Sequence, residues 1–225
     1  MADELEPIFE EFRTKLDERF SDKKFTTEDT IRYLFFYACT KNGVEPNDIT
    51  LESKGIFNTS ITKNAELDMM IESENLSESV AIEFKYHRRE GMEGKAKPQE
   101  YWAGKLLYDF YRLQNITASA GKRLSVYVAS KEMQENYTQM PAYWNLGGLL
   151  GLKRGETTEI SIFENPDTDS KKDLEFWART KGFGRWNNKR KEQIEAASGF
   201  RNAHVQCLFT KDLAGGNVLR IFEIK

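Results

Sequence analysis

The sequence LDMMIESENLSESVAIEFKYH, residues 67–87, decides the fold that we expect for this chain. Apolar and polar residues alternate in residues 67–72 and again in residues 80–87, and the polar stretch SENLSES separates them. Alternation of this kind indicates two half-buried β-strands, and a short polar connection between such strands indicates an antiparallel hairpin. The sequence therefore predicts a hairpin that packs one face against a core.

One register of this hairpin brings six apolar side chains to the same face of the sheet. Directly opposed residues point to the same side, so the register that buries all six is preferred over its neighbours. It pairs Leu67 with Phe84, Met69 with Ile82 and Ile71 with Val80.

The same register determines which residues share the other face. It sets Asp68 opposite Glu83 and Glu66 opposite Lys85, with facing Cβ atoms roughly 5 Å apart. Hard cations such as Mg²⁺ take carboxylate oxygens and keep several waters, so two converging acids suit a metal that also binds water and phosphate. An ammonium nearby can orient the attacking water or stabilise charge on the phosphate.

These residues resemble the motif of the PD-(D/E)XK nuclease superfamily. Fourteen residues separate Asp68 from the run Glu83, Phe84, Lys85. The resemblance implies an α/β fold with a restriction-endonuclease-like core, a mixed central β-sheet flanked by helices. It also implies that Asp68 and Glu83 hold Mg²⁺, for which Mn²⁺ may substitute in such enzymes, and that Lys85 assists the attacking water. The proline that names the motif is absent, since Leu67 precedes Asp68.

Other patterns predict the remaining elements of a mixed α/β chain. Helical spacing predicts a helix over residues 4–20 and a second, buried helix that begins at Thr26 or Thr27. A long helix with Pro98 in its first turn carries an inner apolar stripe. The stripe comprises Trp102, Leu106, Phe110 and Leu113. Strands are expected at residues 124–129, 159–163, 204–210 and 218–224, the last two as a hairpin around LAGGN, with a short helix at 189–197.

We expect one nuclease-like domain over residues 1–225. Residues 1–60 form its N-terminal helical part, residues 61–130 its catalytic core, and residues 131–225 the rest of the sheet and the part that recognises substrate. No apolar run approaches the roughly 18 residues that span a membrane, and the acidic N-terminus is unlike a signal peptide. These features predict a cytoplasmic protein without a membrane partner. Cys39 and Cys207 lie in apolar contexts and are expected to be buried thiols.

The distribution of charge matters more than its sum. The net charge is −3, yet residues 1–29 carry ten acids against five bases, whereas residues 181–191 carry five bases and no acid. A basic segment with aromatic residues suits contact with phosphates and unpaired bases, although a surface loop anchored by its aromatics explains it too. The candidate nucleic-acid contacts are Arg88, Arg89, Lys181, Arg185, Trp186, Lys189 and Arg190.

Several polar residues are candidates for supporting roles beside the motif. Family members often add an acid from the preceding helix, for which Glu28 is the first choice, ahead of Glu45 and Glu52; an acid in a first turn also simply favours the helix dipole. Glu66 either joins the centre or only pairs with Lys85. Gln99 and Lys105 are further candidates.

Two neighbouring features have plainer interpretations. Lys105, Asp109 and Arg112 form one polar stripe on the long helix, for which ordinary surface ion pairs are the simpler reading. His87 falls on the catalytic side of its strand, but a single histidine does not make a metal site.

The sequence thus favours a Mg²⁺-dependent endonuclease that cuts DNA, of a restriction or repair and recombination type. A homodimer would place two active sites on the two strands. The alternative is a non-catalytic module that binds nucleic acid or protein on the same fold. Paired acids without a metal cost energy, which argues against that alternative.

Overall fold

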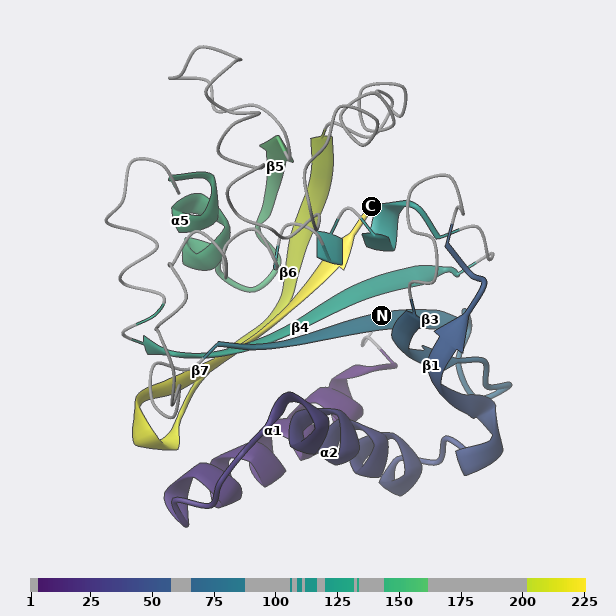
Figure 1. The fold of residues 1–225 in the computed structure, drawn as a ribbon, viewed down its shortest axis with the longest axis horizontal. Coiled ribbons are helices and arrows are strands. Elements are labelled where there is room, and N and C mark those ends of the chain that lie inside the picture. Colours follow the sequence, from purple (N-terminus) through teal and green to yellow (C-terminus); the bar gives the residue numbers. More distant parts are fainter. Residues whose placement is uncertain are drawn as a thin grey trace.

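The structure, a computed structural model, describes residues 4–57, 66–87, 106, 109–110, 112–116, 120–131, 133, 144–161 and 202–225. A seven-stranded mixed sheet lies at its centre, with helices against both faces (Figure 1). The prediction of a mixed α/β fold is confirmed. In chain order the named helices and strands are α1 (Glu6–Ser21), α2 (Glu28–Lys41), β1 (Ile49–Lys54), β2 (Glu66–Ile71), β3 (Val80–His87), β4 (Lys122–Ser130), α5 (Trp144–Gly151), β5 (Thr157–Ser161), β6 (Asn202–Leu213) and β7 (Asn217–Ile224).

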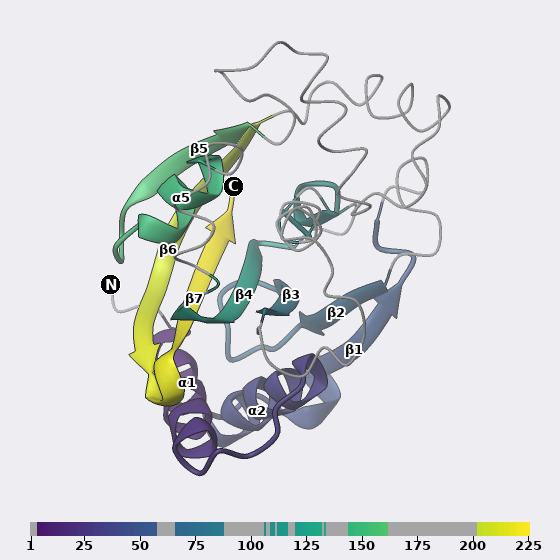
Figure 2. The same cartoon turned by 60° about the vertical axis from the view of Figure 1, so that its left-hand side comes forward.

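The strands run across the sheet in the order β1-β2-β3-β4-β7-β6-β5. Every neighbouring pair is antiparallel except β3 and β4, which are parallel along the whole of β3. Figure 2 shows the twist of this sheet, with β1 and β5 at its opposite ends. The predicted strand at residues 124–129 is confirmed as β4, and it lies centrally, as a continuous apolar run leads one to expect.

Helices α1 and α2 pack side by side under one face of the sheet (Figure 1). The apolar spacing in α1 is the reason, since its buried residues fall on a single stripe. They are Ile8, Phe9, Phe12, Leu16 and Phe20. Helix α2 begins after Thr27, whose side chain accepts a hydrogen bond from Thr30 N while the Thr30 side chain accepts one from Thr27 N. The predicted helix start at a threonine is confirmed.

Aromatic rings link these helices to the sheet. The Phe35 ring of α2 lies 5.1 Å from the Phe12 ring of α1 and 5.4 Å from the Phe84 ring of β3, measured between centroids, both in edge-on geometry. The expectation that α2 is buried on all sides is wrong, because Tyr33 is 63% exposed and Tyr37 44% exposed. Helix α2 lies at the surface of the domain and needs only one apolar face.

The opposite face of the sheet is covered by α5 and by the segment that includes residues 106 and 109–116. Leu106, Phe110 and Leu113 are all buried there, so this part of the predicted inner stripe is confirmed. Pro98 and Trp102 lie outside the described residues, as does the helix predicted at 189–197. None of the helices in the described part of the chain is long and apolar enough to cross a membrane.

The β2–β3 hairpin has the predicted register where its strands pair. Met69 lies opposite Ile82 and Ile71 opposite Val80. The pairing stops at Met69, and the backbone N–H of Phe84 instead donates to the Asp68 carboxylate over 2.8 Å.

The burial of all six apolar residues on one face is wrong. Leu67 belongs to the core on the opposite face of the sheet from Met69. The change of face at Leu67 accompanies an irregularity in β1, the other neighbour of β2. Glu52 of β1 has φ 55° and makes no pair with Asp68. The alternation of faces is thus broken at the residue where the motif begins.

The hairpin at the end of the chain is confirmed. Strands β6 and β7 pair around Ala214–Gly216, where Gly215 and Gly216 have φ of 69° and 71°, a backbone conformation that glycine adopts without strain. Cys39 and Cys207 are free and buried, as predicted. Strand β5 begins two residues earlier than expected, and residues 162–163 lie outside the described part. Strand β1 and helix α5 were not predicted.

The ring contacts make Phe35 a strong test of the core under the sheet. We expect Phe35→Ala to lower the free energy of unfolding by about 3–5 kcal/mol, because it leaves a cavity where several aromatic rings meet. Tyr33→Ala, on the exposed side of the same helix, should change it by no more than about 0.5 kcal/mol. Urea denaturation followed by circular dichroism measures both, and equal losses would contradict this packing.

Candidate active site

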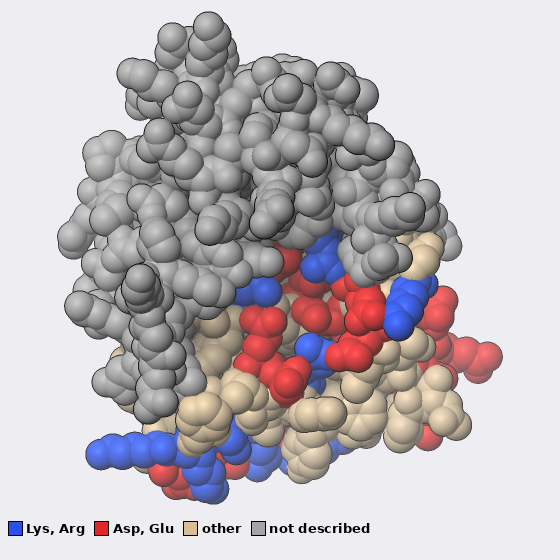
Figure 3. Space-filling view, in the orientation of Figure 1, with Lys and Arg blue, Asp and Glu red and all other residues tan. Residues whose placement is uncertain are grey.

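A group of charged side chains from four parts of the chain meets where β2 and β3 separate. Ion pairs join five of the six residues of this charged cluster, and the sixth, Asp68, acts on Glu83 through its charge. Figure 3 shows acidic side chains gathered around basic ones on one face of the molecule. The charged cluster consists of Glu28 of α2, Asp68 of β2, Glu83 and Lys85 of β3, and Asp109 and Arg112.

Lys85 sits between two carboxylates. Its Nζ lies 3.2 Å from Asp109 Oδ2 and 3.4 Å from Glu28 Oε1, and its side chain is 14% exposed. Burial alone would lower the pKa of Lys85, but the surrounding acids, Asp109 and Glu28 foremost, raise it above its ordinary value. Lys85 is therefore held as a cation at neutral pH.

Glu83 is paired with the guanidinium of Arg112. Arg112 Nη2 lies 2.9 Å from Glu83 Oε1, and Arg112 Nη1 lies 3.6 Å from Asp109 Oδ1. Arg112 also donates to the backbone carbonyl of Glu66 and stacks 4.8 Å above the ring of Phe57. These contacts fix the guanidinium on several sides.

The pKa values of the buried acids are raised in spite of these partners. Burial raises the pKa of Glu83 well above its ordinary value; the neighbouring Asp109 and Asp68 raise it further, while Arg112 and Lys85 oppose the shift. Burial likewise raises the pKa of Asp109, against Lys85 and Arg112. The charge of Asp68 thus acts on Glu83 across the hairpin.

Asp68 is the more open of the two motif acids, with a side chain 18% exposed. One of its oxygens accepts the hydrogen bond from Phe84 N, and the other lies 3.5 Å from Nη2 of Arg32 in α2. Arg32 also pairs with Glu52 at 3.0 Å. Asp68 is thus tied both to the neighbouring strand and to the helix below.

Glu28 reaches the cluster from the first turn of α2. Its carboxylate accepts a hydrogen bond from Tyr86 N at 3.1 Å, in addition to its contact with Lys85. Burial raises the pKa of Glu28, and Lys85 opposes that shift. About a third of its side chain is exposed, so this acid stands at the rim. The choice of Glu28 over Glu45 agrees with these contacts, since Glu45 is exposed.

The structure corrects two predictions about supporting residues. The carboxylate of Glu66 pairs with Lys54 at 3.1 Å and not with Lys85. Asp109 and Arg112 are not ordinary surface ion pairs, because their side chains are only 4% and 13% exposed. The remaining candidates lie outside the described residues: Arg88, Arg89, Gln99, Lys105, Lys181, Arg185, Trp186, Lys189 and Arg190.

Arg32 was not predicted as a site residue, although it lies four residues after Glu28 and so on the same face of α2.

His87 is buried beside the centre, with Nδ1 3.2 Å from the hydroxyl of Tyr127. Burial lowers the pKa of His87 well below its ordinary value, with help from Lys85. It is therefore neutral and serves the core of the domain.

The donor chemistry of the charged cluster fits a hard cation. Glu83 Oε1 and Asp109 Oδ2 are buried and face the cationic groups of Arg112 and Lys85, at 2.9 Å and 3.2 Å. Carboxylate oxygens are the ligands that Mg²⁺ prefers, and a cation beside Asp68 and Glu83 would oppose the effect of burial that raises the pKa of Glu83. As the side chains stand, no three described His, Cys, Asp or Glu residues form a group that could hold a metal ion. Arginine and lysine partners occupy the acids instead.

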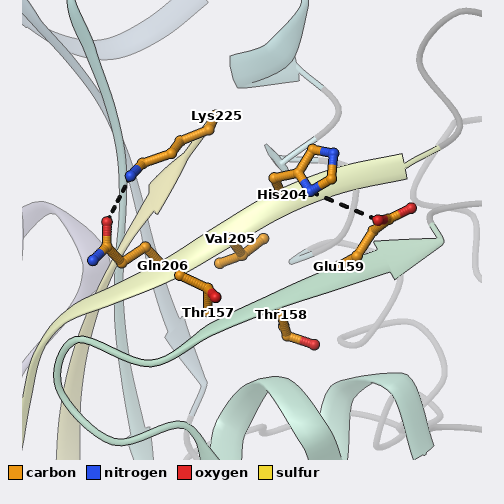
Figure 4. A pocket seen from close by; sticks show the side chains of 7 residues that line it. All are labelled: Thr157, Thr158, Glu159, His204, Val205, Gln206 and Lys225. Atoms are coloured by element: carbon orange, nitrogen blue, oxygen red, sulfur yellow. Dashed lines mark hydrogen bonds and ion pairs between the residues drawn. The ribbon is translucent and has the colours of Figure 1, made fainter.

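A second feature of the surface lies at the far end of the sheet. A pocket runs along β5 and β6, where His204 and Glu159 point toward one another with Nδ1 and Oε2 3.7 Å apart (Figure 4). Both side chains are at least half exposed. Exposed pairs of this kind contribute little energy, so the pocket does not compete with the charged cluster as a centre for chemistry.

Comparisons with family models, with curated proteins and with solved structures find no match to this chain.

The raised pKa of Glu83 leads to a prediction about stability. Because the folded chain binds this proton at pH values where the unfolded chain has released it, stability is fully present below the unfolded pKa of about 4.3 and is lost as pH rises through the folded pKa. Glu83→Gln should therefore make the stability of the metal-free chain depend less on pH between pH 5 and pH 8, because glutamine does not titrate.

Thermal unfolding without divalent ions at pH 5 and pH 8 measures this effect. The control is Glu18→Gln, which removes an exposed acid of α1. The parent should lose more stability between the two pH values than Glu83→Gln does. An equal change of stability between the two pH values in the parent and in Glu83→Gln would contradict the raised pKa of Glu83.

Proposed function

We propose that this chain is a metal-dependent endonuclease that hydrolyses phosphodiester bonds in DNA, built on a restriction-endonuclease-like core. The observation that supports the proposal is that Asp68, Glu83 and Lys85 lie on adjacent strands of a mixed sheet, close enough that the charge of Asp68 raises the pKa of both Glu83 and Lys85. Glu28 also contacts Lys85, in agreement with the acid that the resemblance adds from the preceding helix.

In this proposal Asp68 and Glu83 hold Mg²⁺, or Mn²⁺ in its place. The ion supplies a Lewis acid that polarises the phosphate and lowers the pKa of a bound water. Asp68 is suited to the open side of such a site because it is more exposed than Glu83. Glu83 lies deeper, where its carboxylate is worth more to a cation because little water screens it.

Lys85 acts as a fixed cation in this scheme. Its pKa is raised by Asp109 and Glu28, so it keeps its proton at neutral pH and is a poor general base there. A protonated ammonium still donates hydrogen bonds, and it stabilises negative charge that grows on the phosphate. Lys85 would therefore orient the attacking water and balance charge in the transition state.

DNA binding and dimer formation are further parts of the proposal. Residues 181–191 and the pair Arg88 and Arg89 supply the positive charge that the acidic described surface lacks. A symmetric dimer would bring one centre to each DNA strand.

One observation favours a second candidate, a non-catalytic module that binds nucleic acid or protein. Arg112 pairs with Glu83 and Arg32 with Asp68, so each motif acid already has a cationic partner without a metal. A network of this kind can persist as structure alone. Binding of divalent ions separates the two candidates, because only the nuclease requires it.

Cleavage is the direct test of the nuclease. Plasmid and single-stranded DNA are incubated with Mg²⁺ or Mn²⁺ and with the parent chain, Asp68→Ala or Lys85→Ala. We expect the parent to cut and both variants to lose at least about 100-fold in rate, in line with the loss of a group that stabilises the transition state. Asp22→Ala and Lys15→Ala are matched controls, since both residues lie in exposed ion pairs of α1 and its end.

The melting temperature gives a second measurement on the same proteins. Mn²⁺ should raise that of the parent in a saturable way, and Asp68→Ala should remove the increase. If the parent neither cuts DNA nor responds to Mn²⁺, the nuclease proposal fails and the binding module replaces it.

A further inference from the structure

We propose that Asp109 is a positioning residue of the centre, which holds the Lys85 ammonium in place and ties it, through Arg112, to Glu83. This inference rests on the proposed nuclease function, because it gives Asp109 a part in the same reaction. Asp109 touches neither the substrate nor the metal in this scheme and acts through its two cationic neighbours.

The two oxygens of Asp109 face different cations. Oδ2 lies 3.2 Å from Lys85 Nζ, and Oδ1 lies 3.6 Å from Arg112 Nη1. Arg112 in turn contacts Glu83. Four charges of alternating sign therefore form a chain of three contacts, in the order Lys85, Asp109, Arg112, Glu83. Glu83 and Lys85 come from β3, two residues apart, and Asp109 and Arg112 come from positions i and i+3 of the covering segment.

The spacing of these residues along the chain explains why the four charges can contact one another. Alternate residues of a strand point to the same side, and residues three apart in a helix lie on one face. Strand β3 and the segment that covers it therefore present one acid and one base each. The acid of each element meets the base of the other. Exchange of either acid for a neutral residue would leave two cations, Lys85 and Arg112, with only one carboxylate of the four charges to balance them.

The side chain of Asp109 is more deeply buried than that of Glu28, the other acidic partner of Lys85. The Asp109 side chain is only 4% exposed, whereas that of Glu28 is 36% exposed. Interactions between charges weaken where water screens them, so Asp109 restrains Lys85 more strongly. Lysine has a flexible four-carbon chain, and without such a restraint its ammonium would occupy many positions.

Burial also makes a purely structural role for Asp109 hard to sustain. A buried carboxylate costs free energy, and here burial raises its pKa. Phe110 and Leu113, one and four residues after Asp109, pack this segment into the core. An apolar residue at 109 would serve packing better, so the acid has its use in the charges that it holds.

The first experiment compares the steady-state cleavage of DNA by the parent, Asp109→Asn and Asp109→Glu with saturating Mg²⁺. Asn keeps the shape and removes the charge. We expect kcat to fall about 10- to 100-fold, as for other residues that orient a catalytic group, with KM for DNA changed less than about threefold. Glu restores the charge with a displaced carboxylate and should recover part of kcat. Matched substitution of the exposed Asp22 should change neither constant.

The second experiment needs no activity. Melting temperatures of the metal-free parent, Asp109→Asn, Lys85→Met and the double variant form a thermodynamic cycle. Asp109→Asn should be more favourable to stability in the Lys85→Met background than in the parent, because the acid has lost its cation there. The exposed pair Lys15 and Glu18 provides a control cycle, which should be additive.

The outcomes separate the inference from the function on which it rests. Cleavage by the parent with a lower kcat in Asp109→Asn and a non-additive cycle supports both. Cleavage by the parent with an unchanged kcat in Asp109→Asn, or an additive cycle, overturns the role of Asp109 and leaves the nuclease standing. If Asp109→Asn does not fold, Asp109→Leu replaces it, and a kcat equal to that of the parent in this uncharged variant overturns the role. A parent chain that cuts nothing overturns the nuclease, and with it any part of Asp109 in catalysis.

Discussion

The burial of charge beside β3 is the constraint around which the described structure is arranged. Glu83, Asp109, Lys85 and Arg112 are all largely removed from water, and each pays a desolvation cost that only close partners offset. No single element supplies those partners. The sheet, helix α2 and the segment at residues 109–116 must all be in place before the charges balance, which ties a local site to the long-range fold.

Strand β3 meets this constraint because its two faces do different work. Phe84 and Tyr86 point toward the helices, where their rings lie 5.4 Å from Phe35 and 6.3 Å from Phe20. Glu83 and Lys85 alternate with them and point toward the segment on the other side. Helix α2 both buries the aromatic face and contributes Glu28 to the charged one. The same packing that stabilises the domain thus fixes the direction of the polar side chains.

Local sequence patterns predicted the parts of this arrangement that depend on local physics. The register of β2 and β3, the threonine cap of α2 and the glycine turn between β6 and β7 follow from alternation, side-chain capping and backbone freedom. Strand β1 was missed because it is short and only half buried, and α5 because three glycines lower its helix propensity. The motif residues Asp68, Glu83 and Lys85 could be proposed as site residues because their order is visible along the chain.

Long-range contacts lay beyond those patterns. The change of face at Leu67 coincides with a break in pairing at Asp68, where Glu52 of the neighbouring strand has φ 55°. The partners of Glu66, Asp109 and Arg112 depend on which segment covers the sheet, and a polar stripe on a helix looks the same whether it faces water or other charges. Burial was therefore the quantity that sequence reasoning misjudged.

The raised pKa values of the buried acids indicate why the fold keeps charged residues at this place. Burial raises the pKa of Glu83 and of Asp109 although Arg112 and Lys85 contact them, so their charged forms carry a desolvation cost in the folded chain. Groups chosen for stability alone would be apolar at such depth. Sites where a fold retains an unfavourable charge are typical of chemistry or ligand binding. In the proposed nuclease, a divalent cation held by Asp68 and Glu83 would oppose this cost with an added attraction, while Asp109 acts only on the cationic side chains beside it.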